Sequence, residues 1–163
     1  MNDPLLGTQL PELQLSHSQG GTLSLPQDLK GTWTILYFYP KDDTPGCTKQ
    51  PCSYRDSIED FSKADIAIYG VSMDDLDSHA AFRDKFQLNF PLIADTEGKL
   101  STALGVYGDQ EWAGKIFKGL SRDSFVIDPE GIIRKIWRKV NPTTTMASTY
   151  EAVQELKQAS AAS

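Results

Sequence analysis

The sequence predicts one α/β domain in which helices flank a central sheet of mixed strand direction. An almost continuous apolar run, WTILYFY at residues 33–39, is typical of a strand buried on both faces. A helical period and a second apolar run, IAIYGVS at residues 66–72, follow it. Two strand patterns and an amphipathic helix end the chain, so strands and helices are expected to share one core.

The N-terminal part of the chain predicts a β-hairpin. Leu13 and Leu15 alternate with polar neighbours, which is typical of a short edge strand. The pair Gly20-Gly21 marks a turn, and residues 22–25 form a second short strand pattern.

A helical period follows the central strand, which Pro40 ends because proline cannot donate to a sheet ladder. The residues that recur at helical spacing are Cys47, Pro51, Tyr54, Ile58 and Phe61. The sequence therefore predicts a loop at residues 40–46 and a helix that begins near Cys47.

The middle of the chain predicts another strand, helix and strand. After the strand at residues 66–72, Asp74 or Asp75 can cap a helix that runs to about Phe86. A short strand, a turn and a short helix are then expected at residues 92–94, 95–98 and 99–104.

Residues 105–121 predict a long loop, because glycines recur there at positions 105, 108, 114 and 119. Trp112 and Phe117 are expected to be buried in this loop, which is a candidate for one wall of a site, and packing is the simpler interpretation of Trp112.

The last elements complete the fold. Two strands are expected at residues 125–127 and 132–137, and the type I turn pattern Asp128-Pro129-Glu130-Gly131 joins them. A terminal amphipathic helix is indicated by Met146, Tyr150, Val153 and Leu156. This order predicts a thioredoxin-like fold, with a central mixed sheet, helices on both faces and the N-terminal hairpin added, as one domain over residues 1–163.

Composition excludes several classes of protein. No run of 18 apolar residues is present, so no membrane span is expected, and the N-terminus lacks the pattern of a secretory signal. The net charge of −6 argues against nucleic acid as a partner, and the basic stretch at residues 134–139 fits a half-exposed strand. We expect a cytoplasmic protein, with a processed organellar form as the alternative.

The two cysteines, Cys47 and Cys52, are too few for a disulfide scaffold or a four-cysteine zinc site. His17 and His79 lie 62 residues apart, unlike the close histidines of zinc fingers, so no metal is expected. The sequence leaves two alternatives for the cysteines, which are inert buried thiols or a redox pair.

Cys47 lies at the predicted start of the helix that follows the buried strand. A helix N-terminus carries unpaired N–H groups and a partial positive charge, and both lower the pKa of a thiol there. Gly46 allows close approach of a ligand to the backbone, and Thr44 can hydrogen-bond at the sulfur.

Cys52 follows Cys47 by five residues, which is not the spacing of a disulfide reductase. Five helical residues rise about 7.5 Å, whereas disulfide Cα–Cα distances rarely exceed about 6.8 Å. The two sulfurs therefore cannot bond while the helix is intact. Pro51 disfavours helical geometry at Gln50, so it is expected to make the unwinding of the first helical turns easier.

The segment YFYPKDDTPGCT resembles the active-site segment of peroxiredoxins, with Pro40, Thr44 and Cys47 at the motif positions. The spacing of Cys52 resembles the Q-type subgroup, also called bacterioferritin comigratory protein. The stretch LSRDSFVID is similar to the second motif of the family, which supplies an active-site arginine, here Arg122.

The resemblance implies a thiol peroxidase without metal or organic cofactor. The Cys47 thiolate would reduce hydrogen peroxide or an organic hydroperoxide and become a sulfenic acid. Cys52 would resolve it as an intramolecular disulfide, which thioredoxin or a similar dithiol would reduce. Arg122, Thr44 and the backbone N–H groups of Gly46 and Cys47 would bind the peroxide, Arg122 would also lower the pKa of Cys47, and Pro40 would shield the sulfur. A monomer is expected from the subgroup.

The chain departs from the subgroup at two places. Gln50-Pro51 replaces the usual Glu-Ala before the second cysteine, so no role can be given to a carboxylate there, and Tyr54 stands where Phe is common. Other functions stay open from the residues alone, namely a redox-switch or chaperone-like binding protein that uses the same disulfide, and a general thiol–disulfide exchange protein. The simpler interpretation of Arg122 is that it forms a surface salt bridge.

Overall fold

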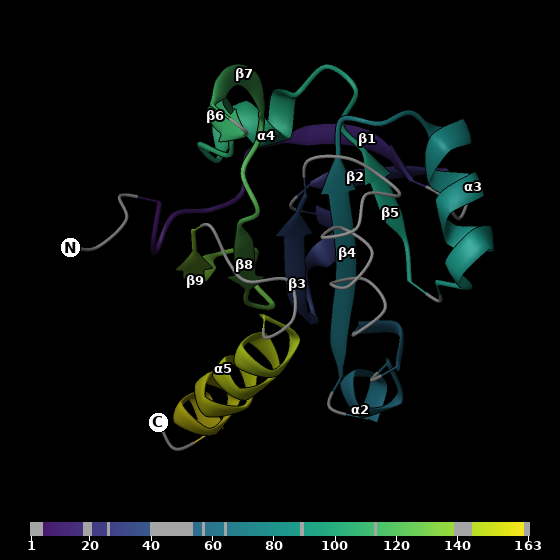
Figure 1. Cartoon of the computed structure of the whole chain (residues 1–163). Coiled ribbons are helices and arrows are strands. Elements are labelled where there is room, and N and C mark those ends of the chain that lie inside the picture. Colours follow the sequence, from purple (N-terminus) through teal and green to yellow (C-terminus); the bar gives the residue numbers. More distant parts are fainter. Residues whose placement is uncertain are drawn as a thin grey trace.

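A computed structural model describes residues 5–17, 21–25, 27–39, 54–56, 58–63, 65–88, 90–112, 114–138 and 145–161. Within these residues, seven strands form one sheet in the order β2-β1-β5-β4-β3-β8-β9 (Figure 1). These strands are β1 (Leu13–His17), β2 (Thr22–Leu25), β3 (Trp33–Phe38), β4 (Ile66–Ser72), β5 (Leu92–Ala94), β8 (Ser124–Ile127) and β9 (Ile133–Trp137).

The helices connect these strands. They are η1 (Gln27–Leu29), α2 (Ile58–Lys63), α3 (Leu76–Phe86), α4 (Lys99–Ala103) and α5 (Thr145–Ala161), and residues 54–56 are also helical. Asp75 caps α3, because its carboxylate accepts a hydrogen bond from the backbone N–H of Ser78 at 2.8 Å. None of the helices within the described residues has the length and apolarity needed to cross a membrane.

The sheet confirms the predicted fold class. β3 is buried along its whole length and lies between β4, which is parallel to it, and β8, which is antiparallel. A sheet with both strand directions is therefore built around the apolar run of residues 33–38. β1 and β2 pair antiparallel, with Leu15 opposite Leu23, so the N-terminal hairpin is confirmed as well.

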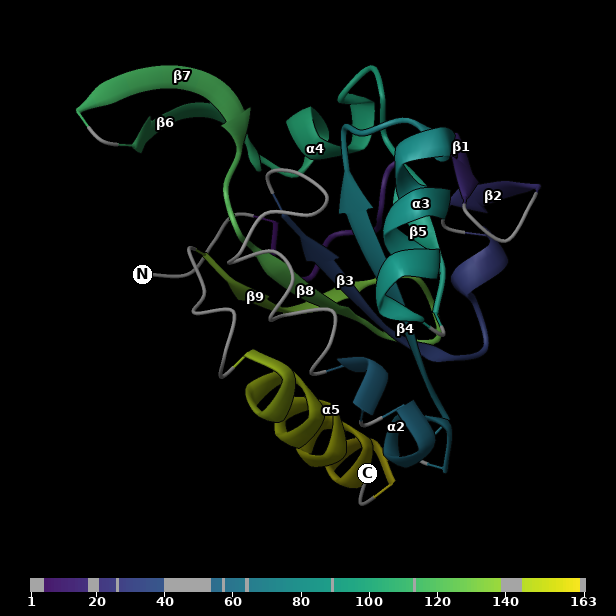
Figure 2. The same ribbon diagram turned by 45° about the vertical axis from the view of Figure 1, so that its right-hand side comes forward.

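Two apolar cores lie on the two faces of the sheet, because successive side chains of β3 alternate between them. Ile35, Tyr37 and Tyr39 join a core with Phe61 of α2, Phe82 of α3 and Val153 of α5. Leu36 and Phe38 join a second core with Leu100 of α4 and with the N-terminal hairpin. Figure 2 shows α2, α3 and α5 on one side of the sheet. Leu100 of α4 belongs to the core on the other face. The predicted helix on each face is thus confirmed.

The prediction of a long loop at residues 105–121 was wrong. β6 (Tyr107–Trp112) and β7 (Lys115–Leu120) form an antiparallel two-stranded ribbon, which projects from the body of the molecule (Figure 2). Gly108 and Gly119 lie opposite one another, so the two strands pair through their backbones at a position without side chains. Gly114, with a φ of 79°, lies in the two-residue connection, where a positive φ favours glycine. The glycines at positions 108, 114 and 119, which suggested a loop, belong to this hairpin, whereas Gly105 precedes it. The side chains of Trp112 and Phe117 lie outside the described residues, so their predicted burial stays a prediction.

Candidate active site

The carboxyl end of β3 is the position from which the cysteine-bearing segment leaves the sheet. The N–H of Phe38 donates to the carbonyl of Asp123 at 2.7 Å, and the N–H of Tyr39 donates to the carbonyl of Val71 at 3.1 Å. The end of β3 is therefore held on both sides, by the residue that precedes β8 and by β4. Ligand sites in open α/β sheets gather at such strand ends.

Tyr54 is the position at which the described chain returns. It is fully buried, and its ring stacks on that of Tyr37 with centroids 5.1 Å apart and planes 16° apart. The rings of Tyr37 and Tyr39 lie 5.6 Å apart. The described residues on either side of residues 40–53 thus meet in one buried aromatic cluster.

Two further contacts fix Tyr54. Its hydroxyl shares a hydrogen bond of 2.8 Å with the buried hydroxyl of Thr149 on α5. Its ring also lies 5.6 Å from the ring of Phe61 on α2. Phenylalanine at this position could not make the bond to Thr149, so the tyrosine ties this point of the chain to the last helix.

Gly70 on β4 makes room for this cluster. A Cβ atom on Gly70 would lie 2.6 Å from the Tyr37 hydroxyl oxygen and 2.8 Å from Cδ2 of Leu92. Real Cβ atoms do not come so close, so glycine is required for the ring of Tyr37 to occupy its place. The prediction from sequence missed this role. The available signal was a glycine inside an apolar strand run.

Five of the predicted site residues, Pro40, Thr44, Gly46, Cys47 and Cys52, lie outside the described residues. Their roles stay predictions, as does the effect assigned to Pro51. Arg122 is the predicted site residue that the structure describes.

Arg122 lies between β7 and β8 and is half-buried. It directly precedes Asp123, whose carbonyl accepts from Phe38, so its backbone lies beside the end of β3. Its Nη1 atom is buried and has no hydrogen-bond partner among the described residues. Buried donors are usually paired, and an arginine side chain is always charged. The site therefore holds a cationic donor suited to an anion, close to where the chain continues toward Cys47.

Asp123, the residue after Arg122, forms an ion pair with Arg138 that the prediction from sequence did not find. Asp123 is fully buried, and Nη1 of Arg138 donates to its Oδ2 at 2.8 Å. The two residues lie 15 positions apart, so sequence spacing gave no sign of the pair. A carboxylate directly before the apolar strand pattern SFVI was the available signal.

Comparisons with known proteins show the family of the chain. The model of the AhpC/TSA family matches residues 6–136. Peroxiredoxin Bcp of Bacillus subtilis (strain 168) is 43% identical over 152 residues, which cover 93% of this chain and 94% of the relative. A chloroplastic peroxiredoxin Q of Triticum aestivum is 38% identical over 152 residues, which cover 92% of this chain and 67% of that protein. A solved structure of Xanthomonas campestris peroxiredoxin Q superposes with a TM-score of 0.82 at 36% identity and covers 88% of this chain and 90% of that one.

Proposed function

The chain belongs to the AhpC/TSA family and is an enzyme of the peroxiredoxin kind, and on that premise we propose that Cys47 is the sulfur that reduces its peroxide. One observation carries the proposal. The buried Nη1 of Arg122, which has no partner among the described residues, belongs to a residue beside the end of β3, and Cys47 follows that strand by nine residues. The residue after Arg122 is therefore hydrogen-bonded to the strand end from which the chain continues to Cys47.

The first step is nucleophilic attack. The thiolate of Cys47 attacks one peroxide oxygen, an S–O bond forms and the O–O bond breaks. The leaving oxygen takes up a proton and departs as water or alcohol. Sulfur loses two electrons to the peroxide and is left as a sulfenic acid.

The site residues stabilise this step. The guanidinium of Arg122 favours the thiolate and the negative charge that develops on oxygen. Thr44 and the backbone N–H groups of Gly46 and Cys47 orient the peroxide, and Pro40 keeps water from the sulfur. The sulfenic acid thus forms in a shielded site, which limits side reactions at the sulfur.

Cys52 resolves the sulfenic acid. Its sulfur attacks the sulfur of Cys47, water leaves, and an intramolecular disulfide forms. Because two helical positions five residues apart are too distant for a disulfide, this step requires the first helical turns to open. Thioredoxin or a similar dithiol then reduces the disulfide by exchange.

The substrates are hydrogen peroxide and organic hydroperoxides. One solved structure at 35% identity, that of Xanthomonas campestris bacterioferritin comigratory protein, was described for its alkyl peroxide reduction activity. We expect the same substrate class here, a monomer, and a cytoplasmic location.

Peroxide consumption coupled to thioredoxin oxidation tests the proposal. Cys47→Ser should abolish turnover. Cys52→Ser should reduce one equivalent of peroxide and then stop. A Cys47→Ser protein with full turnover would overturn the assignment of the nucleophile, and a Cys52→Ser protein with full thioredoxin-dependent turnover would overturn that of the resolving thiol.

A further inference from the structure

The turn at residues 54–56 is the first described part of the chain after the two cysteines, and it is helical. Tyr54 follows Cys52 by two residues. The disulfide proposed above requires the helical turns that carry the cysteines to open. How far this opening extends along the chain depends on how firmly the turn at residues 54–56 is held.

Tyr54 is held by its burial. Its side chain is fully buried among the rings of Tyr37, Phe61 and Phe90. Its hydroxyl shares a hydrogen bond of 2.8 Å with that of Thr149 on α5. If the chain unwound past Tyr54, the ring would enter water and this bond would break, which together lower the population of such an opened state about a hundredfold. An opening that ends before Tyr54 avoids this cost.

Arg55 attaches the same turn to a second helix. Its Nη1 atom donates to the carbonyl of Phe86 at 2.6 Å, and Phe86 is the last residue of α3. The last carbonyls of a helix have no partner within that helix, and the helix dipole favours a cation beside them. Two neighbouring side chains thus attach the turn at residues 54–56 to α5 and to α3.

The two cysteines differ in their distance along the chain from a fixed point. Tyr39 is fixed at the end of β3, because it is fully buried and its N–H donates to the carbonyl of Val71. Cys47 follows Tyr39 by eight residues, whereas Cys52 precedes Tyr54 by two. An extended residue spans about 3.5 Å, so the Cα atom of Cys52 stays within about 7 Å of that of Tyr54. The Cα atom of Cys47 can reach about 28 Å from that of Tyr39.

We propose that Tyr54 is the positioning residue of the resolving step, because it fixes the end of the segment that opens and so holds Cys52 in place. Cys47 then covers most of the distance between the two sulfurs. The turn at residues 54–56 stays helical, so the preceding turns can re-form on it without a new nucleus once the disulfide is reduced. The inference rests on the disulfide proposed above, and it states where the rearrangement ends.

Hydrogen exchange measured by mass spectrometry tests where the opening ends. The reduced protein is compared with the disulfide form made by one equivalent of peroxide. In the disulfide form, the amides of residues 47–53 should exchange at least about tenfold faster, whereas the amides of α2 should stay within about twofold of their rates in the reduced form. Faster exchange in α2 of the disulfide form would mean that the opening passes Tyr54, and it would overturn the inference.

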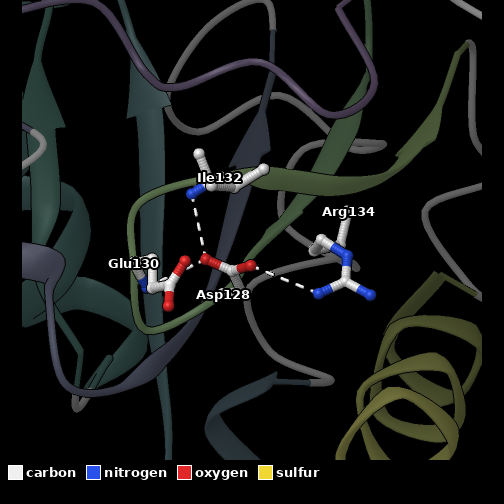
Figure 3. Close-up of polar contacts among 4 residues, drawn as sticks. All are labelled: Asp128, Glu130, Ile132 and Arg134. Atoms are coloured by element: carbon white, nitrogen blue, oxygen red, sulfur yellow. Dashed lines mark hydrogen bonds and ion pairs between the residues drawn. The ribbon is translucent and has the colours of Figure 1, made fainter. Parts of the chain in front are cut away.

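The turn between β8 and β9 supplies an internal reference for these rates. The backbone N–H groups of Glu130 and Ile132 donate to Oδ1 of Asp128 at 2.9 and 3.0 Å (Figure 3). Nη1 of Arg134 lies 3.3 Å from Oδ2 of the same carboxylate. Because β8 runs antiparallel to β3, this turn lies near the start of β3 and away from its carboxyl end. The amides of the turn should therefore exchange equally in the two forms.

Tyr54→Ala tests the residue itself. Without the ring and the hydroxyl, the opening should extend into α2, so the α2 amides should exchange about tenfold faster in the disulfide form than in the reduced form. Phe82→Ala is the matched control, because its ring is also buried in the same core but lies on α3. A cavity at Phe82 should speed exchange equally in both forms, as any merely structural loss would.

The outcomes separate this inference from the proposed function. Equal α2 rates in the two forms of Tyr54→Ala, or a difference of the same size in Phe82→Ala, would overturn the role of Tyr54. If Tyr54→Ala does not fold, Tyr54→Leu takes its place, and the comparison of the two wild-type forms needs no variant. Failure of the proposed function would look different, since peroxide would then produce no link between Cys47 and Cys52 in a tryptic map without reductant.

Discussion

Arg122 is the predicted site residue whose side chain the structure describes. A guanidinium nitrogen that is buried and lacks a described partner is a reserve of hydrogen-bonding capacity, because buried donors are otherwise satisfied. The planar fork of an arginine can contact a sulfur and a peroxide oxygen together, whereas an ammonium group is a point charge. The identity of this residue, and not only its charge, is therefore expected to matter.

Arg122→Lys tests that expectation. The variant should keep the fold and lose about a hundredfold in the rate constant for peroxide, because the paired donors that stabilise the developing charge are gone. Stopped-flow measurement of the first oxidation step gives the rate, and thermal unfolding controls for the fold. A rate equal to that of the wild type would remove Arg122 from the reaction.

A second prediction at the scale of the residue concerns the hydroxyl of Tyr54. Tyr54→Phe removes the buried hydrogen bond to Thr149 and should lower the free energy of unfolding by about 1 kcal/mol. Tyr150→Phe is a matched control on the same helix as Thr149, because its hydroxyl accepts from Gln154 in a partly buried position and should cost under about 0.5 kcal/mol. Urea unfolding of both variants measures the difference. Equal losses would mean that the bond to Thr149 has no special weight.

At the scale of the element, most strands and helices could be predicted from the sequence, because their hydrophobic periods are long and clear. The run at residues 33–38 forms β3, and Asp75 caps α3 as one of the two expected residues. The hairpin of β6 and β7 could not be predicted. Its glycines imitate a loop, and a two-stranded ribbon has little buried surface to impose an alternating pattern.

Gly70→Ala tests how strictly β4 must make room for Tyr37. The added Cβ would displace the ring on which Tyr54 stacks, and overpacking of this kind should lower the free energy of unfolding by about 1–3 kcal/mol. Gly108→Ala on β6 is the control, because a Cβ there meets no atom within 4 Å. If the two variants are equally stable, the tight contact at Gly70 is relieved by movement of the ring.

At the scale of the whole molecule, the site draws on segments far apart in the chain. The order of strands in one sheet brings together the end of β3, Tyr54, and Arg122 in the segment before β8. The motifs made Arg122 a candidate site residue, because a short local stretch of sequence carries it. They could not predict Asp123 with Arg138, Tyr54 with Thr149, or the space at Gly70, since these depend on pairs of residues that only the folded chain brings together.

We propose that Cys47 and Cys52 form one disulfide within one chain after reaction with peroxide. A tryptic map without reductant tests it directly, because Lys49 lies between the two cysteines and cleavage there separates residues 42–49 from residues 50–55. After one equivalent of peroxide, these two peptides should appear as a linked pair from a protein that still runs as a monomer. Free thiols in both peptides, or a link that joins two chains, would contradict the account.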